Sequence, residues 1–222
     1  MQGPAGMTML YRLDADAHSV ARTFGARAGA DPWAGGHVAP GGFAPVITAG
    51  REFIAGPRPA PGPGVGERRM IPRLWGVPPP PSARDGAGRG VTSVRNADSP
   101  FWIGNLRNSE FRCLVPATAF MEWGAGTDRD GRRIRHWFAP TDQRLFAFAG
   151  VWKDSEVPAF ALLSCAANAV LRAAGRDAMP VILPPDPRAQ HLWLHGDWGR
   201  AKALIAPYSS ALLRERQEGE RD

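Results

Sequence analysis

Short apolar segments separated by glycine and proline constrain the fold of this chain more than any other feature. The clearest segments are 111–123, 145–152 and 159–165, and each has Gly, Pro, Asp or Asn within three residues of both ends. Such runs predict β-strands, and Asp130-Gly131 predicts a tight hairpin turn between two of them. With 26 Gly and 22 Pro among 222 residues, the chain favours short strands and loops over long helices.

Helical patterns are confined to short stretches. The best example is 14–29, which Asp14 or Asp16 can cap and Gly25 or Gly29 can end. Ser99 is the expected cap of another short helix, with a proline at its first position. Many short strands with few helices predict one α+β domain, built on a curved, barrel-like, mostly antiparallel sheet flanked by short helices.

The expected domain covers residues 7–208. A flexible extension, 1–6, precedes it, and a charged, disordered tail, 209–222, follows it.

The charge balance is strongly basic. The net charge is +6, and 25 of the 27 basic residues are arginine, since lysine occurs only as Lys153 and Lys202. Two interpretations stay open: the codon bias of a GC-rich genome, or an anionic partner such as nucleic acid. The N-terminus lacks a secretory pattern and no apolar run can span a bilayer, so we expect a cytoplasmic protein. Cys113 and Cys165 lie in apolar segments and are expected to be free thiols in the core.

One acidic residue, Glu122, ends the apolar segment "FRCLVPATAFMEWG". A carboxylate is costly to bury without partners, so Glu122 is either a member of a structural ion pair or an acid/base group. The expected pairing candidates are Arg95, Arg112 and Arg133.

A second polar residue, Asn96, follows a predicted strand in "VTSVRNADSPFW". It is either a turn residue or a hydrogen-bonding group that faces a cleft. Glycine-rich phosphate loops, nucleophile elbows and zinc-type His/Cys spacings are absent from the sequence. His191 and His195 are one helical turn apart but lack an acidic third ligand, so we expect neither a metal nor a cofactor.

Taken together, the segments resemble the SOS response-associated peptidase family, the abasic-site processing proteins. The resemblance covers roughly residues 7–208, and several blocks in the same order are more specific than any single motif. The blocks are "MTMLYRL", "HVAPGGFAPVI", "LWGVPPPP", "VTSVRNADSPFW", "FRCLVPATAFMEW", "HWFA", "LFAFAGVW" and "LLSCAANAVLRAAGRDAMPVILPP".

The resemblance implies an unusual chemistry. Family members begin Met-Cys, and removal of the methionine leaves a cysteine at the N-terminus. Its amine and thiol capture the ring-opened aldehyde of an abasic site in single-stranded DNA, forming a covalent protein–DNA link. The family name also reflects a proposed autoproteolysis of the leading segment. An asparagine, a glutamate and a histidine support the chemistry.

Several of these positions have counterparts here. Asn96 matches the asparagine that orients the N-terminal group and the sugar. Glu122 matches the glutamate that serves as general acid/base beside the amine, where burial can shift a carboxyl pKa toward the working pH. Pro40 in "VAPG" matches the tip of a loop that wedges against DNA, and Trp123 resembles an aromatic that contacts a base or sugar. The further expected DNA contacts are Arg12, Trp75, Arg95 and Arg176.

Two positions depart from the family pattern. Thr8 stands at the nucleophile position, and the family's histidine falls on Gly175. Six residues precede Met7, so a free Thr8 amine requires a start at Met7 and removal of that methionine. A hydroxyl is a poorer nucleophile than a thiol, so the expected product is a transient imine, which can support β-elimination, rather than a stable link.

Two hypotheses about function follow. The first is an enzyme of the peptidase or lyase type that acts on abasic sites in single-stranded DNA through Thr8, Asn96 and Glu122. The second is a catalytically inactive family member that binds single-stranded DNA. Either would be a monomer without membrane association, in the cytoplasm and on the nucleoid when bound to DNA.

Overall fold

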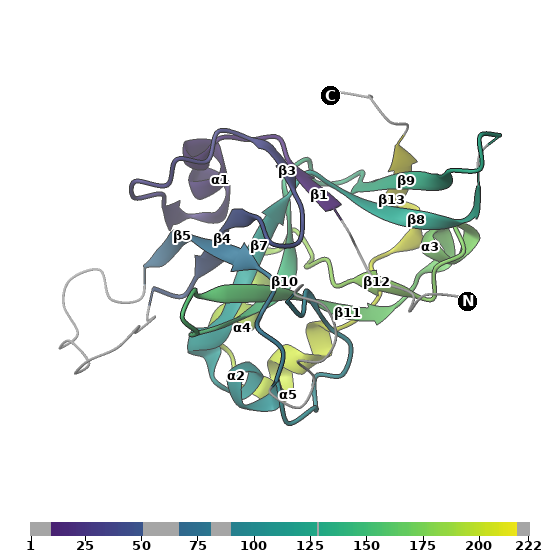
Figure 1. Cartoon of the computed structure of the whole chain (residues 1–222). Helices are drawn as coiled ribbons and strands as arrows, with labels where there is room; N and C mark the ends of the chain where they lie inside the picture. Colours follow the sequence, from purple (N-terminus) through teal and green to yellow (C-terminus); the bar gives the residue numbers. More distant parts are fainter. Residues whose placement is uncertain (1–9, 51–66, 81–89, 128, 217–222) are drawn as a thin grey trace.

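The strands of this protein form two sheets that share one α+β domain (Figure 1). The computed structural model describes residues 10–50, 67–80, 90–127 and 129–216. Among these residues, one sheet has five strands in the order β13-β9-β8-β1-β3. The other has eight, with β12-β11-β10-β7-β4-β5-β2 in order and β6 beside β11. The expected fold class is confirmed.

The elements have the following bounds. The strands are β1 (Leu10–Leu13), β2 (Ala26–Arg27), β3 (Gly36–Val38), β4 (Phe43–Thr48), β5 (Arg68–Trp75), β6 (Ser93–Val94), β7 (Arg112–Ala117), β8 (Ala119–Thr127), β9 (Arg133–Pro140), β10 (Phe146–Lys153), β11 (Ala159–Ala166), β12 (Ala178–Pro180) and β13 (Leu213–Arg216). The α-helices are α1 (Ala17–Phe24), α2 (Ile103–Arg107), α3 (Ala169–Ala173), α4 (Pro187–His195) and α5 (Trp198–Ala201).

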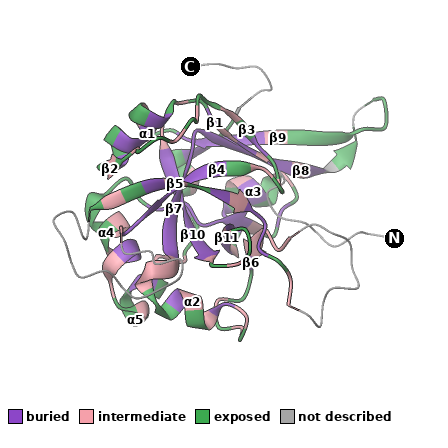
Figure 2. Cartoon of the chain, turned by 60° about the vertical axis from the view of Figure 1, so that its left-hand side comes forward, coloured by how far each residue is buried: buried purple, intermediate pink, exposed green. Residues whose placement is uncertain are grey.

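The larger sheet closes on itself. Strands β5, β4, β7, β10 and β11 pair in sequence, and β11 also pairs in parallel with β5 through Ala159↔Leu74 and Phe160↔Trp75. The result is a ring of strands rather than a clean barrel. The ring encloses the main core, and every residue of β7 is buried, as expected for a strand covered on both faces (Figure 2).

The smaller sheet carries the hairpin that the sequence predicts. Strands β8 and β9 pair through Phe120↔Phe138 and Glu122↔His136, with a register shift between Trp123 and Thr127. Gly131 has φ +75°, which suits its place at the turn. The outer part of β9 is exposed and projects from the body of the domain (Figure 2).

Helix boundaries follow local hydrogen bonds. The Asp16 carboxylate accepts the Ser19 N–H at 2.8 Å and caps α1, which ends at Gly25 with φ +59°. Helix α2 begins at Ile103, later than the Ser99 cap predicts. The Ser99 carbonyl instead accepts the backbone N–H of Trp102 in a turn.

The predicted disordered tail is corrected by the structure. Leu213–Arg216 form β13, which pairs with β9, and the Leu213 side chain is 4% exposed. Residues 217–222 lie outside the described residues. Among the described residues, no helix is long and apolar enough to cross a lipid bilayer.

Candidate functional site

Glu122 lies at the margin of the core, on the inner face of β8. Its side chain is 1% exposed, and its Oε2 atom lies 3.2 Å from Nε of Arg176, which is 8% exposed. A buried carboxylate needs such a cation, because its desolvation is otherwise too costly. Arg176 is the cation that lies beside Glu122, and the sequence analysis named Arg95, Arg112 and Arg133 as candidates but not Arg176.

The turn at the end of α3 positions Arg176 beside Glu122. The Asn168 side chain accepts the Leu171 N–H at 3.0 Å and caps the helix. Gly175, with φ +80°, then turns the chain, and the Arg176 N–H bonds to the Leu171 carbonyl at 2.9 Å. The residue beside Glu122 is thus the one after Gly175. Its burial against Glu122 also argues against the predicted role of Arg176 as an open DNA contact.

Strand β1 lies directly against β8. Leu10 pairs with Met121, and Tyr11 pairs with Phe120. Thr8, the predicted reactive residue, lies outside the described residues. The first described residue is Leu10, whose ladder partner Met121 directly precedes Glu122. The start of the described chain is therefore close to the strand that carries Glu122.

Asn96 is exposed and follows β6. Its side-chain oxygen accepts the Asp98 N–H at 3.0 Å, which agrees with the turn interpretation. Strand β6 pairs with β11 through Val94↔Leu163, while β12 pairs with the other edge of β11 through Ala178↔Ala166. Asn96 and the Arg176 turn therefore approach the same end of β11 from its two sides.

The outer face of the smaller sheet combines arginine with tryptophan. We call Arg12, Trp123, Arg133, Arg135 and Trp137 the arginine–tryptophan face. Trp123 is half-buried, with the Arg133 and Arg135 guanidinium carbons 5.0 and 5.9 Å from its ring centroid. Arg12 lies 5.9 Å from the centroid of the Trp137 ring and pairs with Asp14 at 2.6 Å. The half-buried Trp123 ring and its exposed arginines suit the bases and phosphates of an unpaired strand, whereas the Trp137 ring is only 6% exposed.

Pro40 and Trp75 meet at the turn between β3 and β4. Pro40 is half-buried, and the neighbouring Phe43 is 57% exposed. The Trp75 backbone fixes the turn, because its carbonyl accepts the Gly41 N–H at 2.8 Å and its N–H bonds to the Gly42 carbonyl at 2.9 Å. The Trp75 ring is 0% exposed and donates to the Thr92 carbonyl. Trp75 thus supports the loop, and its buried ring is not open to DNA as predicted.

Three residues of this region were not predicted from the sequence. Arg135 and Trp137 alternate with Arg133 along β9, and this period of two was available as a signal for one shared face. His136, on the opposite face, lies with Nδ1 at 2.7 Å from Glu215 Oε1. That contact depends on β13, which the sequence analysis placed in the tail.

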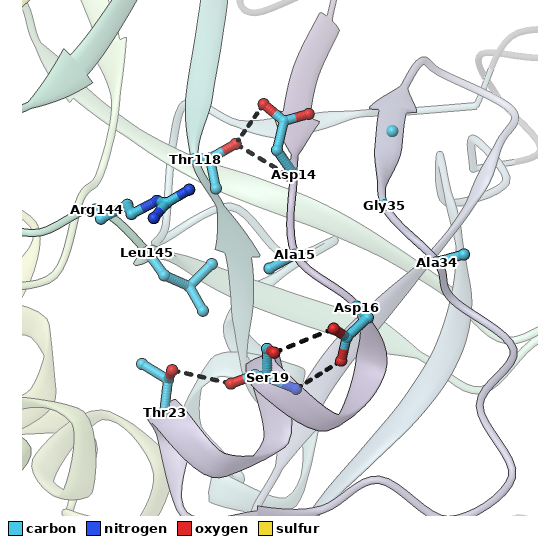
Figure 3. Close-up of a pocket in the computed structure, with 11 residues that line it drawn as sticks. Asp14, Ala15, Asp16, Ser19, Thr23, Ala34, Gly35, Thr118, Arg144 and Leu145 are labelled. Carbon is cyan, nitrogen blue, oxygen red and sulfur yellow. Dashed lines mark hydrogen bonds between the residues drawn. The ribbon is translucent and has the colours of Figure 1, made fainter. Parts of the chain in front are cut away.

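A separate pocket of ≈ 710 Å³ lies at the start of α1 (Figure 3). Its polar side chains bind the backbone around them: the Asp16 carboxylate accepts the Ser19 N–H at 2.8 Å, and the Thr118 hydroxyl accepts the Asp14 N–H at 3.1 Å. Carboxylates also disfavour a phosphate backbone. We therefore do not consider this pocket a candidate nucleic-acid site.

Histidine and cysteine form no further reactive cluster in the described part of the chain. The His191 and His195 rings stack with centroids 4.5 Å apart, beside Arg27 and Arg68. Groups of three or more His, Cys, Asp or Glu placed to hold a metal ion do not occur among these residues. Both cysteines are free, as predicted, and burial raises the pKa of the half-buried Cys165 to about 11.

The family model for SOS response associated peptidase (SRAP) matches residues 7–217. The chain belongs to this family, which supports a DNA-related role associated with the SOS response. In a sequence comparison, no curated protein matches the chain.

Solved structures show the same fold. A protein from Bordetella bronchiseptica superposes with a TM-score of 0.69 at 20% identity, covering 93% of this chain and 97% of its own. A protein from Bacteroides thetaiotaomicron superposes with a TM-score of 0.67 at 17% identity, covering 93% of this chain and 90% of its own. A phage-related protein from Bordetella bronchiseptica superposes with a TM-score of 0.67 at 17% identity, covering 96% of this chain and 94% of its own.

Proposed function

We propose that the protein acts on abasic sites in single-stranded DNA, forming an imine between the Thr8 amine and the opened sugar. The observation that carries this proposal is the placement of a buried carboxylate, Glu122, on the strand that pairs with β1. An acid/base group has to lie within hydrogen-bond reach of the reacting amine, directly or through one water. The pairing of Leu10 with Met121 supports such an arrangement.

The arginine–tryptophan face supports the choice of substrate. It lies on the outer side of the same strand, so a flexible strand of DNA can stack on Trp123 while a nucleotide reaches the inner edge. Duplex DNA is stiffer and holds its bases stacked against one another. Asn96, at the end of β6, is the proposed second polar group and orients the opened sugar.

The test is borohydride trapping. Protein translated from Met7 is incubated with single-stranded DNA that carries one abasic site, and then reduced. We expect a covalent adduct that Glu122→Gln reduces about 100-fold or more. Protein with residues 1–7 retained is the matched control, because it lacks a free Thr8 amine, and it should form no adduct. Absence of an adduct in the protein started at Met7 would contradict the proposal.

A second candidate function is binding of single-stranded DNA without reaction. The observation that favours it is the pairing of Glu122 with Arg176, since arginine keeps its proton and offers none for transfer. This candidate predicts salt-sensitive binding with no adduct under any condition.

A further inference from the structure

Another pocket lies beside β2, at one edge of the larger sheet, and helix α4 lines it. Its volume is ≈ 580 Å³, within the usual size of small-ligand pockets. Its charged and titratable side chains are those of Arg27, Glu67, Arg68, His191 and His195. Figure 1 and Figure 2 both show β5 and α4 on the side of the domain away from the β8–β9 hairpin. The pocket is therefore separate from Glu122 and from the arginine–tryptophan face.

Arg68 is the half-buried cation of this pocket. Its Nη1 atom donates to the Phe24 carbonyl at 2.8 Å and to the Gln190 side-chain oxygen at 3.0 Å, so α1 and α4 both hold it. Both acceptors are neutral, and within the described ranges Arg68 forms no ion pair. Burial lowers the pKa of Arg68 from the ordinary arginine value, yet its guanidinium stays protonated at neutral pH. A partly desolvated cation without a carboxylate favours an anionic ligand.

The other edge of the Arg68 guanidinium is open. Its Nε and Nη2 atoms make no hydrogen bond to the part of the chain that the structure describes, and they are not buried. This edge is a planar fork that matches two oxygens of one anion. The carboxylate of the pocket does not occupy the fork, because Glu67 pairs with the exposed Arg27 at 3.1 Å.

Two stacked imidazoles add further hydrogen-bond donors. His191 and His195 are one turn apart on α4, with ring centroids 4.5 Å apart and planes inclined by 27°. Their ring N–H groups and the Arg68 fork exceed what the two oxygens of a carboxylate can accept, and they suit the three oxygens of a phosphate monoester. A metal cation is disfavoured, because two guanidinium groups line the same pocket.

We propose that this pocket binds a nucleotide through its phosphate monoester. Arg68 holds the phosphate, and the exposed ring of His191 offers a face on which the base stacks. The nucleotide is either free or the 5′-phosphorylated end of a nucleic-acid strand. Binding here makes and breaks no covalent bond, and it does not depend on the reaction proposed for Glu122.

Titration calorimetry with deoxyadenosine 5′-monophosphate tests the proposal against two comparison ligands. Deoxyadenosine lacks the phosphate and inorganic phosphate lacks the base, so each should bind at least about tenfold more weakly than the monophosphate. Equal affinity for the monophosphate and either comparison ligand, or no binding of the monophosphate, overturns the inference.

Three variants locate the site. Arg68→Gln should weaken binding of the monophosphate about tenfold or more, since it removes charge-assisted hydrogen bonds. The matched control is Arg188→Gln, which removes the same charge from an exposed position on α4 and should bind normally. His191→Gln keeps the test sound if loss of Arg68 loosens the contact between α1 and α4, and should weaken binding about threefold. Normal binding by both Arg68→Gln and His191→Gln overturns the inference.

A competition experiment identifies the source of the phosphate. One oligonucleotide, prepared with a 5′-phosphate and with a 5′-hydroxyl, competes with the bound monophosphate. Displacement by the phosphorylated form alone supports the end of a strand as the ligand, and displacement by neither form supports a free nucleotide. Equal displacement by both forms overturns the inference, because the monophosphate would then occupy a surface that does not recognise the 5′-phosphate.

Discussion

Glu122 and Trp123 are consecutive residues of β8, yet they lie in opposite environments. Glu122 faces inward, is 1% exposed and is paired with a buried arginine. Trp123 faces outward, half-buried, with the cations of Arg133 and Arg135 over its ring. Alternation along a strand thus separates a closed inner face, which carries the buried Glu122–Arg176 pair, from a more open outer face, which carries exposed arginines.

The two faces of β8 also differ in the energetic cost of losing a charge. Charges on the inner face are desolvated, so removing one partner leaves the other without compensation. Charges on the outer face are hydrated, so removing one changes the affinity for an anion but hardly changes the free energy of unfolding. Mutations on the inner face should therefore change stability and chemistry, and mutations on the outer face should change DNA binding.

The largest effect is expected for the buried ion pair. Arg176→Ala should lower the free energy of unfolding by about 3–5 kcal/mol, because it leaves the Glu122 carboxylate buried without its cation. Denaturant unfolding measures this change. The matched control is Lys202→Ala, which breaks the exposed pair with Asp98 and should cost at most about 1 kcal/mol. Equal losses of unfolding free energy in the two variants would contradict the burial of the Glu122–Arg176 pair.

The next effect is on binding. Trp123→Ala should weaken the affinity for single-stranded DNA by about 1–3 kcal/mol, the usual contribution of a stacked base. Fluorescence anisotropy with a labelled oligonucleotide measures it. Trp198→Ala, a half-buried tryptophan of α5, should leave the affinity unchanged. An equal loss of affinity in both variants would show that Trp123 makes no specific contact with the DNA.

A smaller effect concerns salt. The double substitution Arg133→Gln and Arg135→Gln should reduce the slope of log K against log salt by about 1.4, since each phosphate contact with a single strand contributes about 0.7. Binding at several salt concentrations gives the slope. Arg188→Gln with Arg200→Gln changes the same net charge on α4 and α5, and an equal change there would indicate a general charge effect.

The smallest effect concerns a half-buried thiol on β11 of the larger sheet and needs no mutation. The pKa of Cys165 is raised from 9.0 to about 11 by burial, so the folded protein keeps this thiol protonated at neutral pH. Alkylation by iodoacetamide should be slow at pH 8 and should accelerate as the pH rises toward 11. Because the folded pKa is raised, the stabilising contribution of the protonated thiol is intact below pH 9 and is lost as pH rises through 11. Rapid labelling at pH 8 would show that the edge of β11 opens.

The sequence predicts the strands well where apolar runs are long, as in β7, β10 and β11. Here local composition and tertiary burial favour the same structure. It also predicts the hairpin at Gly131 and the capping of α1, because turn and cap chemistry is local. It fails for β13, whose residues are mostly charged. That strand is specified by its ladder with β9 and by the burial of Leu213, and both are tertiary effects.

The sequence also predicts only part of the candidate site. Glu122 stands out as a lone acid in an apolar run, so the sequence alone identifies it. Its partner Arg176 and the contact between His136 and Glu215 join residues far apart in the chain, which only the fold brings together. Trp75 was misassigned because an aromatic residue in a matching block gives no information about its burial, and this ring points into the core.

The most direct test of the account is to locate the trapped adduct in the protein translated from Met7. After reduction, tryptic digestion and mass spectrometry, the account predicts the sugar remnant on the N-terminal peptide that begins at Thr8. The chain has just two lysines, Lys153 and Lys202, so the competing amines are few. An adduct on either lysine, with Thr8 unmodified, would contradict the account.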